Sequence, residues 1–108
     1  MSKKNECILP KTLAIYIEAV VMDYARREAA LEGNDISEST RKQYIKFNIA
    51  VDMGFAFLEP ALKDTMFKDI VSKRGYYSSE ASAIICRNAY YKRRARILYN
   101  IAIALNMA

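Results

Sequence analysis

Apolar residues recur at intervals of three and four along most of this chain, which is the period of an amphipathic α-helix rather than of a strand. The pattern predicts five helices, over residues 10–31, 35–58, 60–73, 78–86 and 88–105. In the first of these, Asp23 and Arg27 can form an ion pair across one turn. The second begins at Asp35 or Ser37 and the fourth at Ser78 or Ser79, because Asp and Ser cap helix N-termini. Asn106 follows the last segment and tolerates the left-handed backbone of a C-terminal cap. We therefore expect an all-α fold of about five helices.

The second half of the 35–58 helix is apolar around most of its circumference. Its apolar residues are Phe47, Ile49, Val51, Met53, Phe55, Phe57 and Leu58. A helix of this kind is either central in its own fold or shared with another subunit. A chain of 108 residues has little material to surround it, so a homodimer and a monomer built around a central helix are both open.

The last predicted helix has one apolar face and one basic face. At 100° per residue, one narrow stripe holds Tyr91, Ala95, Leu98, Ala102 and Leu105. The opposite side holds Lys92, Arg93, Arg96 and Asn100. One face can pack against the protein while the other offers cations and an amide to an anion. This is the build of a recognition helix in a helix-turn-helix module.

The same segment carries a family resemblance. Tyr90-Tyr91-Lys92-Arg93-Arg94, followed by Ile97-Leu98-Tyr99, resembles the C-terminal end of phage-type transcriptional regulators of the RinA/ArpU kind. Those proteins are similar in turn to region 4 of bacterial sigma factors. The resemblance covers roughly the last 40 residues, and Tyr24-Ala25-Arg26-Arg27 looks like the first helix of that group. It implies a helix-turn-helix in which Ala81 takes the small position of the first helix, Ile84 and Cys86 are apolar packing residues, and Ile85 replaces the customary glycine of the turn.

The charge distribution favours a polyanionic partner for the C-terminal third. The formal net charge is +5, and residues 1–58 hold as many acidic as basic residues. From Ile70 onward there are seven basic residues against Glu80 alone. Such an asymmetry is expected when one end of a domain meets nucleic acid. We expect one helical domain over residues 1–108, with 10–73 as a scaffold and 74–108 as the helix-turn-helix.

Duplex DNA is the partner that this reading predicts, and the basic residues divide by position. The candidates for base edges are Arg87, Asn88, Lys92 and Arg93, near the leading end of the helix. Arg96 and Asn100 lie further back and would meet phosphate, while Lys73 and Arg74 would grip the backbone on the flank. Arg94 is placed at the edge of the core.

Other interpretations of the same residues remain open. The basic face is also compatible with a solvated surface, or with docking an acidic protein such as an RNA polymerase subunit. Tyrosines interleaved with the cations suggest stacking on single strands. Packing is the stronger interpretation for them: Tyr91 is predicted in the core, Tyr76 and Tyr77 wedge the loop, and Tyr90 is the one expected to be exposed.

Enzymatic and metal-dependent functions are not expected. The chain has no His and only two Cys, so it cannot supply a tetrahedral zinc site, and no glycine-rich phosphate loop occurs. Cys86 is placed at an apolar packing position. No cofactor is implied. No signal peptide or membrane-spanning apolar run is found, so we expect a cytoplasmic protein.

Overall fold

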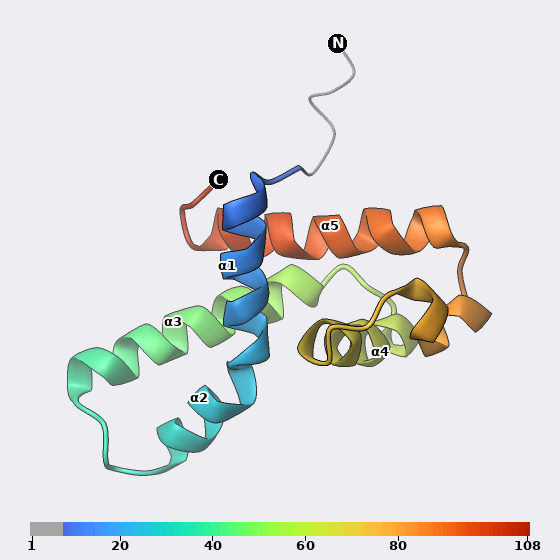
Figure 1. Cartoon of the computed structure of the whole chain (residues 1–108). Helices are drawn as coiled ribbons and strands as arrows, with labels where there is room; N and C mark the ends of the chain where they lie inside the picture. The colour runs from blue at the N-terminus through green and yellow to red at the C-terminus, as the bar shows by residue number, and fades with distance from the viewer. Residues whose placement is uncertain (1–7) are drawn as a thin grey trace.

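Five α-helices account for most of the chain in the computed structural model, which describes residues 8–108 (Figure 1). They are α1 (Lys11–Met22), α2 (Tyr24–Glu32), α3 (Glu38–Phe55), α4 (Pro60–Val71) and α5 (Arg87–Ala104). Two short 3-10 turns, η2 (Tyr76–Ser78) and η3 (Glu80–Ala83), lie between α4 and α5. The described residues contain no strand. The prediction of an all-α fold with about five helices is confirmed.

Local side-chain chemistry sets most of the helix ends. The Ser37 hydroxyl accepts a hydrogen bond from the Thr40 amide at 3.2 Å, so α3 is capped at Ser37, the second of the two expected starts. Pro60 is the first residue of α4, where its missing N–H costs nothing. Asn106 adopts a left-handed conformation with φ of 61°, as expected for the cap of α5.

The predicted first helix, residues 10–31, is divided at Asp23. The backbone there turns to φ −94° and ψ 6°, which ends α1 and begins α2. The Asp23 carboxylate accepts hydrogen bonds from Nε and Nη2 of Arg26 at 2.7 and 2.6 Å. Asp is a poor residue for a helix interior because its side chain bonds locally. The expected Asp23–Arg27 ion pair does form, at 3.6 Å.

The centre of the fold is the packing of α3 against α5, which run side by side in roughly opposite directions (Figure 1). Gly54 allows this close approach: a Cβ atom at that position would lie 2.3 Å from Cγ1 of Ile101. On one side α1 crosses α5 and α2 packs along α3. The fully buried side chains include Ile17, Val21, Val51, Leu62, Met66, Ile70, Ile97 and Ile101.

The apolar helix α3 has one face in the core and another in solvent. Ala50, Val51, Gly54 and Phe55 are buried, which makes α3 a central helix. A second row at intervals of four points outward and is between 43% and 56% exposed; it consists of Ile45, Ile49, Met53 and, just beyond the helix, Phe57. We call this row the α3 stripe. The sequence pattern of α3 is therefore only half explained by the core of one chain.

Candidate nucleic-acid interface

The N-terminal half of α5 is fixed by a buried polar contact with α4. The Tyr90 side chain is fully buried, and its hydroxyl donates to Oδ2 of Asp69 at 2.8 Å. Burial, and next the hydrogen bond to Asp69, raise the pKa of Tyr90 to about 12, so the phenol keeps its proton. Nη1 of Arg94 donates both to this hydroxyl at 2.8 Å and to the Arg74 carbonyl at 2.7 Å.

The segment between α4 and α5 is tied to α5 by Tyr76. Its backbone amide donates to the Tyr91 hydroxyl at 3.1 Å, and its own hydroxyl donates to the Ile85 carbonyl at 2.8 Å. Ala81 is fully buried, in agreement with the small position predicted for it. Tyr76 therefore holds the connecting segment against the start of α5 through both its backbone and its side chain.

The short α-helix predicted for residues 78–86 is wrong, because this segment forms 3-10 turns instead. The hydroxyl of Ser79 accepts from the Ala81 amide at 2.9 Å, and the hydroxyl of Ser82 donates to the Ser79 carbonyl at 2.9 Å. Such local bonds compete with the helical pattern. The corner expected at Arg87 and Asn88 lies earlier, since α5 already begins at Arg87.

The turn also lacks the left-handed residue of a helix-turn-helix. Within residues 8–108, the non-glycine residues with positive φ are Lys73 and Asn106, so Ile85 is not strained. Cys86, expected at an apolar packing position, is instead the exposed residue that precedes α5. Within residues 74–108, α5 is therefore preceded by two 3-10 turns and not by the first α-helix of a helix-turn-helix.

The buried face of α5 is rotated from the predicted one in its first half. Tyr91, predicted to be in the core, is 39% exposed, whereas Tyr90, predicted to be exposed, is fully buried. Leu98, Ala102 and Leu105 are buried as expected. The exchange follows from the contact of Tyr90 with Asp69, a buried partner on α4 that periodicity within α5 cannot reveal.

The structure brings four of the predicted site residues together on exposed positions of α5. They are Arg87, Asn88, Lys92 and Arg96, of which the last three follow one another at intervals of four along one side. Arg93 and Asn100, assigned to the same face, are half-buried. The guanidinium of Arg87 lies over the Tyr91 ring, 5.2 Å from its centroid, which orients this cation. We call these four residues the α5 basic stripe.

The two flanking cations differ in how firmly they are held. Arg74 is exposed, but its Nε lies 3.9 Å from Oδ1 of Asp69 and its carbonyl accepts from Arg94. Lys73 is exposed and adopts a left-handed conformation with φ of 57°. Arg94 is half-buried with both of its bonds internal, which agrees with its predicted place at the core edge.

Acidic groups do little to neutralise this end of the molecule. Asp69 is 2% exposed and is engaged by Tyr90 and Arg74. Glu80, in η3, is the one acidic residue between Ile70 and the C-terminus, and it is exposed. The α5 basic stripe therefore lies at an end of the molecule with an excess of positive charge, which attracts anions from solution.

Sequence reasoning missed two exposed apolar side chains near the basic end. Tyr77, expected to wedge the loop, is 82% exposed, and Ile84, expected to pack, is 51% exposed. Tyr76 does pack as predicted, since its ring lies 5.4 Å from that of Tyr90. Adjacent tyrosines carry no signal in the sequence that tells which of them the turn will bury.

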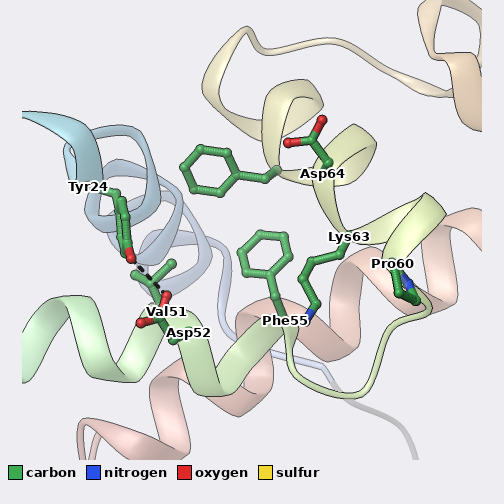
Figure 2. A pocket seen from close by; sticks show the side chains of 8 residues that line it. Tyr24, Val51, Asp52, Phe55, Pro60, Lys63 and Asp64 are labelled. Carbon is green, nitrogen blue, oxygen red and sulfur yellow. Dashed lines mark hydrogen bonds between the residues drawn. The ribbon is translucent and has the colours of Figure 1, made fainter.

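A separate cleft of about 460 Å³ opens where α2, α3 and α4 meet (Figure 2). Its apolar wall includes Tyr24, Phe55 and Phe67, whose rings meet edge to face. The Tyr24 hydroxyl donates to Oδ1 of Asp52 at 2.9 Å, and burial, followed by this bond, raises the pKa of Tyr24 to about 12. With Asp52 and Asp64 against Lys63, the lining is net acidic and does not extend the basic surface.

Comparison with known proteins gives no assignment: no protein-family model, curated protein or solved structure matches the chain. Among the described helices, none is long and apolar enough to cross a membrane. Residues 8–108 also contain no cluster of three or more side chains that could hold a metal ion.

Proposed function

We propose that the protein binds duplex DNA through the α5 basic stripe. The observation that carries this proposal is the outward row of Asn88, Lys92 and Arg96 on a helix whose opposite side is anchored in the core. An α-helix fits the major groove, where Asn pairs with adenine and Arg with guanine. Arg87 and Asn88, at the leading end, are the candidates for base edges.

Phosphate contacts supply most of the affinity in this proposal. Lys92 and Arg96 continue the row of cations along the helix, and Lys73 and Arg74 flank its start. Neutralising phosphates releases counterions, so the affinity falls steeply as salt is raised. By the resemblance of its last 40 residues, the protein acts as a transcriptional regulator of the phage type.

A fluorescence anisotropy titration of a labelled duplex at two salt concentrations tests this function. The wild type should lose affinity at the higher salt, and the double variant Lys92→Ala/Arg96→Ala should bind more weakly, with a salt slope reduced by about two. The matched control is Lys11→Ala/Lys63→Ala, which removes the same charge from exposed positions on α1 and α4. A wild-type affinity that does not respond to salt, or equal losses in both variants, contradicts the proposal.

We also propose that two copies associate through the α3 stripe. Its four side chains, Ile45, Ile49, Met53 and Phe57, extend over about 18 Å of helix at 1.5 Å per residue. A contiguous exposed row of large apolar residues is typical of an interaction surface. DNA-binding proteins of this size commonly use a twofold axis to place two reading helices on neighbouring half-sites.

Charge complementarity favours a second copy of this chain as the occupant of the stripe. The first half of α3 carries Lys42 and Lys46, which form no ion pair within residues 8–108. Asp52 and Glu59 lie toward the other end, and both are exposed. Two antiparallel copies of α3 would set the basic half of each against the acidic end of its partner.

The oligomeric state in solution tests this association. Light scattering at micromolar concentration should give a dimer for the wild type and a monomer for Ile49→Lys, because the new charge would be buried at the interface. Ile15→Lys on α1, an equally exposed position, is the control and should remain dimeric. A monomeric wild type, or a dimeric Ile49→Lys variant, would contradict the assignment.

An acidic protein is the second candidate partner for the basic end of α5. The apolar side chains of Ile84 and Tyr91, exposed beside Arg87, favour it, because protein interfaces combine apolar contacts with a polar rim. An RNA polymerase subunit is such a partner. Co-elution with that subunit, together with no retention on DNA, would support this function in place of the first.

A further inference from the structure

Tyr77 is the most exposed of the large apolar side chains in the described part of the chain, at 82%. It lies in η2, next to the cations Lys73 and Arg74 in sequence, and the segment is tied to the start of α5. An aromatic ring so exposed contributes little to the core, so its position calls for another explanation. Lys73 and Arg74, which precede it by four and three residues, favour a ring that is attached to phosphate, as a nucleobase is.

A chain of aromatic contacts supports Tyr77 from behind. Its ring meets that of Tyr76 edge to face at 5.3 Å, Tyr76 meets Tyr90 at 5.4 Å, and Tyr90 meets Tyr91 at 5.0 Å. The last ring carries the guanidinium of Arg87. The chain thus links the exposed phenol of Tyr77 to the first residue of the α5 basic stripe through rings that are held in place.

The backbone under Tyr77 is also fixed. The Ser78 amide donates to the Gly75 carbonyl at 3.2 Å, and the Ser79 amide donates to the Tyr76 carbonyl at 3.0 Å. The side chain of Tyr76 is anchored to the Ile85 carbonyl. A ring held on such a turn loses little conformational entropy when it stacks on a ligand.

We propose that Tyr77 is a stacking platform for an unpaired nucleobase, so that the protein prefers DNA with a gap or a single-stranded overhang beside the duplex. This inference rests on the proposed DNA-binding function and adds a second element to it. Paired bases inside a duplex have no free face, whereas an unpaired base next to the helix end can cover the phenol ring. Lys73 and Arg74, the two flanking cations, would hold the phosphates on either side.

Stacking on one aromatic side chain strengthens binding by roughly five-fold or more, and it is tolerant of sequence because every base has a π-face. The preference should therefore be independent of base identity. It should also persist at salt concentrations that weaken the duplex contacts, because stacking releases no counterions.

Two probes with the same duplex sequence separate stacking from duplex binding. One is a closed dumbbell whose ends are joined by hexaethylene glycol linkers, so that it has no unpaired base, and the other carries a four-nucleotide overhang containing 2-aminopurine. The wild type should bind the overhang roughly five-fold more tightly and change the 2-aminopurine fluorescence. Tyr77→Phe should behave like the wild type, because it retains the ring. Tyr77→Ala should lose the preference while its affinity for the dumbbell is unchanged.

The control is Tyr16→Ala, which removes an exposed tyrosine from α1, far along the chain from the basic end. It should retain the preference for the overhang. Equal affinity of the wild type for both probes, or a preference that survives in Tyr77→Ala, overturns the stacking proposal and leaves duplex binding intact. Failure to bind either probe overturns the proposed function itself.

Discussion

Arginines serve opposite purposes at the two ends of this molecule. In the α1–α3 region each is bound internally: Arg26 donates to Asp23, Arg27 to Asn48 and the Val20 carbonyl, and Arg41 to the carbonyls of Leu31 and Gly33. At the start of α5, Arg87 points outward and touches only an aromatic face among the contacts described. Lys92, one turn later, is exposed.

Whether a basic residue remains available to a ligand therefore depends on the hydrogen-bond acceptors near it rather than on the number of cations. Arg26 and Arg27 are adjacent cations in the sequence, yet Arg27 is 3% exposed. Its burial lowers its pKa, and nearby Asp23 opposes that shift. In the C-terminal third, Arg74 and Arg94 are also bound internally, whereas Arg87 and Lys92 are exposed on a part of the chain with few acidic residues.

The largest expected effect on stability comes from comparing two variants that each remove one arginine, one from each region. Arg27→Met should lower the free energy of unfolding by about 3 kcal/mol, because it removes charged hydrogen bonds of 2.6 Å to Asn48 and Val20 and leaves their oxygens buried. The matched variant Arg87→Met, at an exposed site, should change it by less than about 0.5 kcal/mol. Urea denaturation measures both. Equal losses in the two variants would remove the distinction.

A second variant addresses the seam between the two regions, where α3 meets α5. Gly54→Ala should destabilise the fold by about 2 kcal/mol, because its Cβ would lie 2.3 Å from Cγ1 of Ile101 and 3.0 Å from the Ile97 carbonyl. Higher helix propensity offsets part of this cost. Gly33→Ala is the control, since its Cβ would have no neighbour nearer than 3.8 Å. Thermal unfolding measures both variants. If Gly54→Ala were as stable as the wild type, α3 and α5 would be able to move apart to accommodate the methyl group.

The third test concerns the buried hydrogen bond between Tyr90 and Asp69 at the basic end. Tyr90→Phe should cost about 1–2 kcal/mol, because it deprives the buried Asp69 carboxylate of its hydroxyl donor. The pKa of Tyr90 is raised from 10 to about 12, so the folded state keeps a proton that the unfolded state loses. Its stabilising contribution is therefore complete below pH 10 and is lost between pH 10 and 12.

Denaturation in urea at pH 9 and pH 11 measures this effect. The wild type should lose stability between the two, and Tyr90→Phe should lose less. The variant should retain some alkaline loss from Tyr24, whose pKa is also raised to about 12. The same alkaline loss in both proteins would show that the Tyr90 proton does not contribute. Tyr77→Phe, at an exposed phenol, should match the wild type.

Periodicity and capping were enough to predict an all-α fold of about five helices and several of the helix ends. The number agrees because the division at Asp23 adds a helix where the one predicted for residues 78–86 is absent. Ser37, Pro60 and Asn106 act at helix termini through short-range rules that the sequence states directly. The outward direction of Lys92 and Arg96 was also predictable, because a long helix must turn its charged side to water.

The errors lie where a contact that the helical repeat does not encode decides the structure, whether that contact is distant or local. Tyr90 and Tyr91 are equivalent within α5, and only Asp69 on α4 determines which of them is buried. The 3-10 turns depend on hydroxyl bonds of Ser79 and Ser82, which compete closely with a helix of the same sequence. Arg27 was expected only to pair with Asp23, because its second partner, Asn48, lies 21 residues away.

The smallest expected effect separates the structural and electrostatic roles of a single cation. Lys73 lies two residues beyond the end of α4 with φ of 57°, and the Arg74 amide that follows donates to the Asp69 carbonyl at 2.8 Å. Lys73→Gly should stabilise the fold by about 0.5–1 kcal/mol, since glycine adopts this conformation without a steric penalty. The same change removes one flanking charge, so the salt slope of DNA binding should fall by about one. Lys73→Gln, which removes the charge but keeps the strained backbone, should lower the slope without gaining stability. A slope that is unchanged in both variants would place Lys73 outside the DNA contact and confine the nucleic-acid interface to α5.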